Sequence, residues 1–148
     1  MKKLTIVLIL SIAITNLSLA HEVKYDGFNK PESVAEGSDG YIYVSEIGEK
    51  DIDGDGKISK IDKKGNITDF ATGLYDPKGI VFYKDKLYVT DRDAIIEINN
   101  DGSWSVFGST MAFPKTPVFL NDIDVDTDGN FYITDTSNFE TGGIVFKM

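Results

Sequence analysis

Residues 40–46 of the chain read GYIYVSE, and the pattern returns as DKLYVTD at 85–91 and as GNFYITD at 129–135. The central tyrosine, Tyr43 in the first copy, recurs at spacings of 45 and 44 residues. Each segment alternates in polarity and is rich in β-branched and aromatic residues, so each is predicted to be a β-strand. Each follows a turn, and two of the turns contain Asp-Gly, a strong hairpin signal. The chain is therefore a threefold repeat, and the repeat decides its fold.

Short strands flank each repeated segment and extend it to a unit of three or four strands. The predicted flanking strands are 33–36, 57–61 and 66–71 in the first copy, 79–82, 94–98 and 103–107 in the second, and 123–125 and 143–147 in the third. Four short antiparallel strands in roughly 40–50 residues are typical of a β-propeller blade. We therefore predict an all-β fold, a partial β-propeller of about three four-stranded antiparallel blades. A β-sandwich or a stack of hairpins is the alternative, but neither requires so regular a period.

The predicted blades span approximately 31–74, 77–110 and 120–148, and residues 22–28 are predicted to be a closing outer strand. Closed propellers have roughly four to eight blades, so three blades leave three possibilities. The chain is a truncated or half-length part of a longer propeller, or two copies pair as a homodimer that completes a six-bladed ring. In the third possibility the half-ring stands open with exposed strand edges. We rank the three in that order.

The first twenty residues resemble a secretory signal peptide. Two lysines are followed by an apolar run from 4 to 14, and small residues precede position 21. The run is short for a membrane span, which needs about 20 apolar residues, so cleavage is preferred to a retained anchor. We expect residues 1–20 to be removed, and the mature chain, 21–148, to be periplasmic or secreted and free of the membrane.

The charge of the chain limits its partners. The net charge is −9, and removing the two signal-peptide lysines leaves −11. A phosphate backbone or an anionic membrane requires a basic surface, so neither nucleic acid nor membrane is an expected partner. The chain contains no cysteine, so disulfides do not contribute to its stability. An acidic protein of this kind suits a cation or a neutral ligand.

The sharpest local motif lies at 51–62, which reads DIDGDGKISKID and matches the D-x-D-x-D-G pattern of a calcium loop. Alternate aspartates present carboxylates, a glycine allows the sharp turn, and the next backbone carbonyl is a further ligand. The loop is an insertion of about eight residues relative to the second copy, and its carboxylates would repel one another without a cation. The predicted Ca²⁺ ligands are Asp51, Asp53, Asp55, the Lys57 carbonyl and, at the twelfth position, Asp62.

This loop departs from an EF-hand in two respects. Asp62 is shorter than the usual glutamate, and the flanking segments are strands, so we interpret it as a calcium loop set in a blade. The same D-x-D-x-D-G pattern recurs at 124–129, across a strand and its hairpin turn. Alternation in a strand distributes side chains over two faces, so a structural role is preferred there.

One rim of the predicted blades gathers polar residues from all three repeats. In a four-stranded meander, the loop entering the first strand and the loop after the second strand lie at the same end. The entry positions are Glu32, Lys78 and Asn121, and the second strands end at Glu46, Asp91 and Asp135. The entry positions belong to the innermost strands, so Glu32 and Asn121 would direct oxygen atoms toward a central funnel, an arrangement that suits calcium. Ordinary solvated loop polarity is the alternative, and for Asn121 the two interpretations weigh equally.

The repeated strand DG-x-Φ-Y-V-[ST]-[DE], where Φ is apolar, resembles the senescence marker protein/gluconolactonase/luciferin-regenerating-enzyme family and, more broadly, the NHL-type propellers. The likeness covers most of 27–148. Pro31–Glu32 resembles the first-blade Pro-Glu of the family, which implies that Glu32 binds a central divalent metal. Asn121 and Asp122 resemble its third-blade Asn-Asp motif, which implies substrate binding. The family's other metal ligands would fall beyond Met148.

Taken with the signal peptide and the calcium loop, the resemblance implies an exported, calcium-associated propeller similar to gluconolactonase-type lactone hydrolases, without a complete active site on this chain alone. The expected ligand is a small sugar or lactone, and the funnel metal is calcium or another divalent cation. No catalytic residue is assigned, and we lean against catalysis by this chain as it stands. Two alternatives stay open: a non-catalytic module that binds a ligand or a protein, and a non-functional fragment of a longer propeller.

Overall fold

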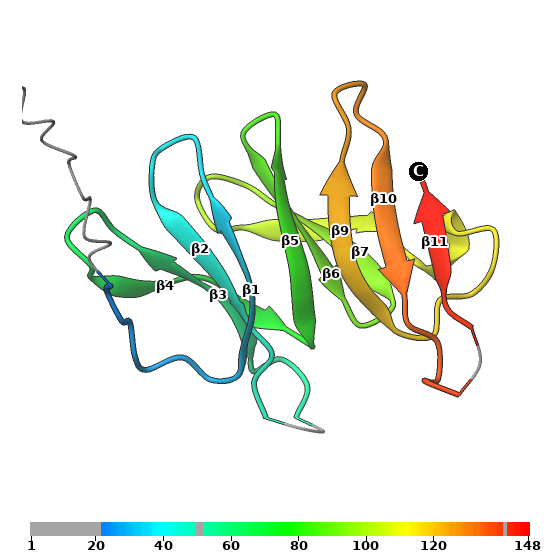
Figure 1. Cartoon of the computed structure of the whole chain (residues 1–148), viewed down its shortest axis with the longest axis horizontal. Coiled ribbons are helices and arrows are strands. Elements are labelled where there is room, and N and C mark those ends of the chain that lie inside the picture. Colours follow the sequence, from blue (N-terminus) through cyan, green and yellow to red (C-terminus); the bar gives the residue numbers. More distant parts are fainter. Residues whose placement is uncertain (1–21, 50–51, 141) are drawn as a thin grey trace, which may run out of the picture.

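The computed structural model describes residues 22–49, 52–140 and 142–148, and within them the chain folds into three antiparallel β-sheets (Figure 1). The first sheet contains β1 (Pro31–Glu36), β2 (Ile42–Glu46), β3 (Gly56–Ile61) and β4 (Ile67–Leu74). The second contains β5 (Pro77–Tyr83), β6 (Lys86–Asp91), β7 (Ala94–Ile98) and β8 (Trp104–Gly108). The third contains β9 (Leu120–Val125), β10 (Phe131–Asp135) and β11 (Ile144–Lys147). A short 3₁₀ turn, Thr110–Ala112, joins the second sheet to the third.

Each sheet is a simple meander, in which every strand pairs with the next one along the chain. The repeated tyrosines Tyr43, Tyr88 and Tyr132 all lie in the second strand of their sheets. The all-β prediction is therefore confirmed, and so is the strand repeat on which it was based. The third sheet has three strands in the described part of the chain.

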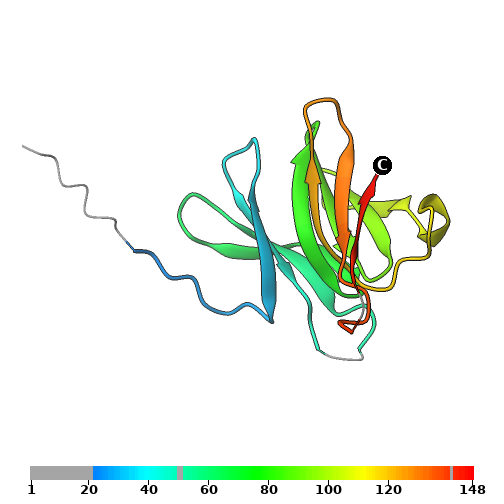
Figure 2. The same ribbon diagram turned by 45° about the vertical axis from the view of Figure 1, so that its right-hand side comes forward.

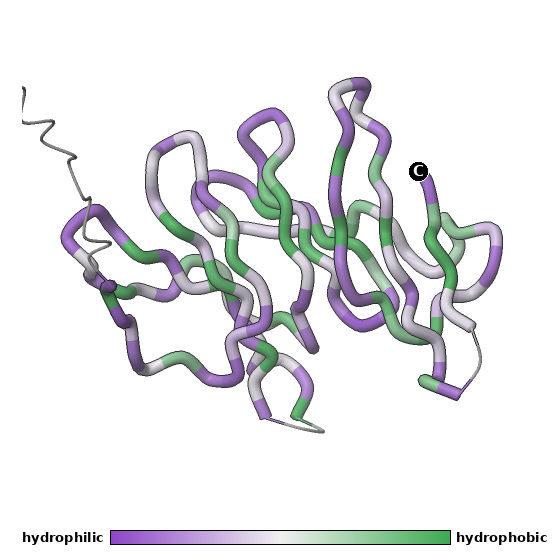
Figure 3. Tube along the Cα trace, viewed as in Figure 1, coloured by the Kyte–Doolittle hydropathy of each residue, from purple (hydrophilic) through white to green (hydrophobic). Residues whose placement is uncertain are grey.

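Two apolar layers hold the sheets together. Tyr43 and Ile58 of the first sheet pack with Leu87 and Val89 of the second. On the opposite face of the second sheet, Tyr88 packs with the third sheet. Because β6 is covered on both faces, it is buried almost throughout instead of alternating between core and solvent. Figure 3 shows the apolar segments along the strands and the polar ones at the turns.

The first strands of the three sheets lie next to one another. β5 packs against β1 on one side and β9 on the other, and the later strands of each sheet extend away from them (Figures 1 and 2). Gly79 permits this approach, because a Cβ at that position would lie 2.6 Å from the Cα of Asp122. The three sheets are thus arranged around a shared inner edge formed by β1, β5 and β9.

The N-terminal segment departs from its prediction. Residues 22–28 form no strand, although they were expected to be a closing outer strand. They run beside the first sheet, where the ring of Tyr25 approaches Gly65 in the β3–β4 turn. The strand they would pair with, β11, lies at the opposite end of the three sheets (Figure 1). Within a single open set of blades, the two cannot meet.

The predicted signal peptide, residues 1–20, lies outside the described residues. Its cleavage and the export of the chain therefore stay predictions. In the part of the chain that the structure describes, no helix has the length and apolar character needed to cross a bilayer.

Candidate functional site

Three buried carboxylates mark equivalent positions at the ends of β2, β6 and β10. They are Glu46, Asp91 and Asp135, with only 1%, 2% and 3% of their surface exposed. Buried carboxylates require hydrogen-bond donors, and each of these finds them in the loop that enters its own sheet. The sequence placed the three on one rim but did not reveal this role. Their identical position in each repeat was the signal that could have done so.

Each carboxylate accepts hydrogen bonds from backbone N–H groups of its entry loop. Asp91 accepts from the backbone of Tyr75 at 3.0 Å and of Asp76 at 2.5 Å. Asp135 accepts from the backbone N–H of Val118 at 2.8 Å and from that of Phe119 at 3.0 Å. Burial raises the pKa of Asp91 above its ordinary value despite these donors. Burial also acts to raise the pKa of Asp135, but its backbone donors outweigh burial and lower it.

Beside each carboxylate, the innermost strand contains a β-bulge. The register shifts between Pro31 and Val34 in β1, and between Pro77 and Ile80 in β5. A bulge re-aims the side chains of its strand, and bulges are frequent next to functional sites. Hydroxyl groups satisfy the interrupted backbone. The backbone N–H of Ser33 donates to Ser45 Oγ at 3.0 Å, the backbone N–H of Asp122 donates to Thr134 Oγ1 at 2.9 Å, and Thr90 Oγ1 donates to the Asn121 carbonyl at 2.6 Å. The repeated β-bulge therefore sets the direction of the side chains at the entry positions.

The bulges bring entry residues from different sheets within electrostatic reach of one another. Partial burial is the main cause that raises the pKa of Glu32, the negative charge of Asp122 adds to it, and the Lys78 ammonium opposes it. Lys78 is buried, donates to the Asp76 carboxylate at 2.5 Å, and lies 4.4 Å from the centre of the Phe119 ring. The amide of Asn121 donates to Thr136 Oγ1 at 3.3 Å. We call Glu32, Lys78, Asn121 and Asp122 the inner cluster.

The inner cluster offers oxygen ligands but does not complete a cation site. The negative charge of Asp122 acts on the Glu32 carboxylate, and a cation would relieve that repulsion. The Lys78 ammonium already supplies positive charge nearby. Among the described residues, no group of three or more acidic, histidine or cysteine side chains is placed to hold a metal ion. What this cluster can do is bind and orient a polar ligand.

The predicted calcium loop is only partly visible, because Asp51 lies outside the described residues. Asp53 pairs with the Arg92 guanidinium of the second sheet at 2.5 Å. Asp55 accepts a hydrogen bond on Oδ2 from the Glu49 backbone at 2.7 Å. Its other oxygen, Oδ1, is buried and has no hydrogen-bond partner among the described residues. An unpaired buried carboxylate oxygen is the kind of group that a bound cation satisfies.

The remaining two predicted ligands lie along β3. Lys57 directs its ammonium to the Asp69 carboxylate at 2.7 Å, and its carbonyl lies at the loop end of the strand. Asp62 follows the far end of β3, about 20 Å away for a strand of this length. It accepts hydrogen bonds from the backbone of Lys64 at 2.8 Å and of Asn66 at 2.9 Å, and so closes the β3–β4 turn. The extended strand therefore separates Asp62 from the loop, and the EF-hand-like twelfth position does not apply here.

The second aspartate motif, at 124–129, is a hairpin turn, as its position in the repeat indicated. Asp126 accepts hydrogen bonds from the Asn130 backbone at 2.8 Å and from the Asn130 side chain at 2.7 Å. Those bonds lower the pKa of Asp126 to about 2, with the side-chain bond as the main cause. The Asp126 carboxylate therefore stabilises its own hairpin turn.

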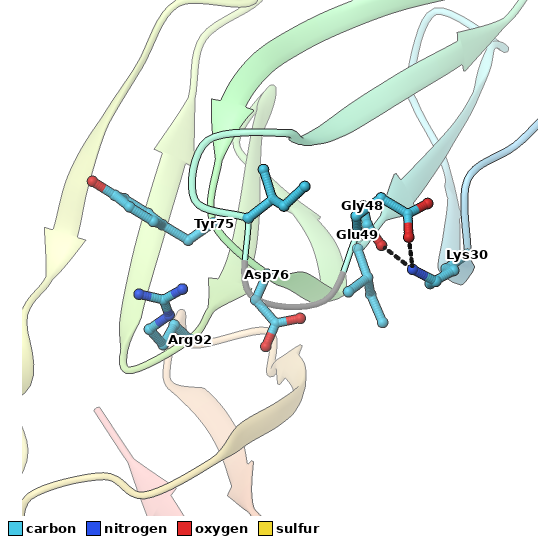
Figure 4. Close-up of a pocket in the computed structure, with 8 residues that line it drawn as sticks. Lys30, Gly48, Glu49, Tyr75, Asp76 and Arg92 are labelled. Carbon is cyan, nitrogen blue, oxygen red and sulfur yellow. Dashed lines mark hydrogen bonds and ion pairs between the residues drawn. The ribbon is translucent and has the colours of Figure 1, made fainter.

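Two hollows lie on the rim between the first and second sheets. The first, of about 450 Å³, is bordered by Lys30, Glu49 and Asp76, and Figure 4 shows Lys30 bonded to Glu49 and to the Gly48 carbonyl. The second, of about 490 Å³, extends along the second sheet toward β8. Tyr75 and Arg92 border both hollows, so this pair forms the wall between them.

Three consecutive antiparallel meanders around a common inner edge define a set of β-propeller blades, and comparison with solved structures agrees. No family model and no curated protein matches the sequence. A protein provisionally named a gluconolactonase has 18% identity and a TM-score of 0.57 over 73% of this chain. A luciferin-regenerating enzyme has 9% identity and a TM-score of 0.61 over 80%. A protein from Thermus thermophilus, provisionally named an oxidoreductase of the glucose dehydrogenase kind, has 18% identity and a TM-score of 0.56 over 79%.

These likenesses establish the fold. The expected resemblance to gluconolactonase-like and luciferin-regenerating propellers is therefore confirmed at the level of structure. The chain covers 42%, 45% and 44% of those three proteins, so it spans less than half the length of each.

Proposed function

We propose that this chain is an exported, calcium-associated propeller unit that binds a sugar or lactone at its inner cluster, in the manner of the gluconolactonase-type proteins it resembles. The observation that carries the proposal is that β5 packs against both β1 and β9, which places Glu32, Lys78 and Asp122 of three different sheets within electrostatic range of one another. Three independent contributions of polar side chains to one place favour a ligand site over ordinary surface polarity.

The chemistry of the inner cluster supports binding rather than complete catalysis by one chain. When present, a divalent metal polarises a lactone carbonyl and activates water. The described residues supply an ammonium, two carboxylates and the Asn121 amide, which suffice to hold the hydroxyls and carbonyl of a sugar acid. A second copy that completes a six-bladed ring is the proposed source of further groups. Val34 of the first sheet and Val145 of the third are exposed on the two end sheets, where such a copy would pack.

Calcium-dependent binding of D-gluconate, a stable product analogue, tests the inner cluster. We expect mature protein to bind it when calcium is present, and Glu32→Gln to weaken the binding by at least about tenfold, because the charged Glu32 carboxylate is the proposed ligand of the calcium that bridges to the gluconate anion. Isothermal titration calorimetry with and without calcium measures this. If the protein also opens the ring of gluconolactone when calcium is present, and the Glu32→Gln variant does not, the proposed function would include catalysis. Binding without ring opening would favour the non-catalytic module.

Two outcomes of the same experiment contradict the proposal. One is the absence of gluconate binding to folded protein, and the other is equal binding by the Glu32→Gln variant. Sedimentation of the same samples reports their assembly: a mass of two chains supports the homodimer, and a folded monomer that still binds would remove the second copy from the proposal.

The calcium loop makes a separate prediction. Calcium at about 10 mM is expected to raise the melting temperature by about 5 °C, the effect of a ligand at roughly ten times a millimolar dissociation constant. Asp55→Asn should abolish the shift, because its buried oxygen is the proposed ligand. Scanning calorimetry measures it. Asp128→Asn, from the matching motif at 124–129, is the control and should keep the full shift. An equal shift in both variants would contradict the assignment of the loop.

A further inference from the structure

A second ligand site is suggested by the larger of the two rim hollows, which is lined by none of the residues of the inner cluster. We call it the side pocket and define it by Asp53, Tyr75, Arg92, Asp93, Trp104 and Val106. Its volume, about 490 Å³, falls in the range of small-molecule sites. β8, which supplies Trp104, is the outermost strand of its sheet, whereas the inner cluster lies on the innermost strands.

Trp104 is presented to the side pocket in a fixed orientation. Its indole Nε1 donates a hydrogen bond of 2.9 Å to the Thr72 carbonyl in β4, so the ring is tied to the neighbouring sheet. Despite this bond, 36% of Trp104 stays exposed, and Val106 two residues later is 55% exposed. Side chains two apart in a strand share a face, so these two form one apolar surface. A rigid, half-open indole face is a suitable platform for a flat apolar partner.

Polar groups of fixed geometry border that surface. The Arg92 guanidinium lies 5.0 Å from the centre of the Tyr75 ring, and Figure 4 shows the two side chains together. The same guanidinium pairs with Asp53 at 2.5 Å, so its charge is balanced, while 50% of the Arg92 side chain is exposed and can meet a ligand. Asp93 adds a partly exposed carboxylate that accepts hydrogen bonds. The inserted loop of the first sheet thus closes the pocket from one side through Asp53.

This combination matches the chemistry of a neutral sugar. A pyranose ring has a face of C–H groups that packs on an indole, and hydroxyls around its edge that bond to planar donors and acceptors. A cationic ligand is a poorer fit, because the Arg92 guanidinium already lies over the face of the Tyr75 ring. We propose that the side pocket binds a neutral saccharide, with one pyranose ring stacked on Trp104 and its hydroxyls bonded to Arg92 and Asp93. The adjoining hollow shares Tyr75 and Arg92 and would take the next sugar unit.

The sole tryptophan of the chain makes the test direct, because its fluorescence reports on this pocket alone. Mature protein is titrated with cellotetraose, maltotetraose and chitotetraose up to about 10 mM, a range that captures millimolar affinities. We expect at least one to shift the emission in a saturable manner. Arg92→Ala and Asp93→Asn should each weaken that response by at least about tenfold. Met111→Gln, at a 93% exposed side chain, is the matched control and should not change it.

Calorimetry with the responding saccharide adds a readout that does not depend on the indole. Trp104→Phe should retain weakened binding, and Trp104→Ala should lose it, with circular dichroism confirming that both variants fold. The proposal is overturned if none of the three saccharides shifts the emission of folded protein. It is also overturned if tetramethylammonium binds in their place, or if Arg92→Ala and Asp93→Asn bind as tightly as the parent.

Discussion

The Gly79→Val variant is expected to lose about 3 kcal/mol of unfolding free energy, near the upper end for overpacking in a tightly packed core. At this position β5 lies against β9, and a Cβ would stand 2.6 Å from Asp122 Cα and 2.8 Å from the Asn121 carbonyl oxygen. The Cα and the carbonyl are backbone atoms, so a rotamer change cannot relieve the collision, and the two inner strands must separate. Urea unfolding followed by circular dichroism measures the loss.

Gly142→Ala is the matched control for this prediction. A Cβ at Gly142 meets nothing within 4 Å, so its variant should differ from the parent by less than about 0.5 kcal/mol. Gly79→Ala should fall between the two, since it adds one carbon at the same contact. If Gly79→Val were as stable as the parent, the close packing of the second and third sheets would be wrong, and the inner cluster would lose its geometric basis.

The fold could be predicted from the sequence because short-range sequence signals determine it. Alternating apolar residues, Asp-Gly turns and a period near 44 residues predict the strands, and the meander follows from their short connections. Residues 22–28 were misassigned for a related reason. Local likeness to a fourth strand indicates β potential, whereas pairing requires an available edge, and that edge lies at the far end of the sheets.

The candidate site was less accessible, because several of its features depend on contacts between sheets. The entry position of Glu32 was predictable from strand parity, but the influence of the Asp122 charge on Glu32 was not. Pattern matching placed Asp62 in the calcium loop because an EF-hand loop curls back on itself, while a strand carries the same residue away. The pairing of Asp53 with Arg92 spans 39 residues of sequence, and no local motif encodes it.

The Asp91→Ala variant is expected to be the other strongly destabilised protein, losing about 2–4 kcal/mol of unfolding free energy. Asp91 is 2% exposed and accepts hydrogen bonds from the backbone of Tyr75 and Asp76. Alanine would leave both N–H groups without an acceptor and release the loop that enters the second blade. Asp128→Ala, at an exposed turn position, should change the unfolding free energy by less than about 0.5 kcal/mol in the same urea titration.

Asparagine at position 91 separates the role of charge from that of hydrogen bonding. Burial raises the pKa of Asp91, so the folded state favours the protonated carboxyl, and the stability from this preference is lost as pH rises through the folded-state pKa. Asp91→Asn retains one acceptor without the buried charge, so at neutral pH it should lose less unfolding free energy than Asp91→Ala. If the two variants lose the same unfolding free energy, the carboxylate does not hold the entry loop through its acceptor atoms.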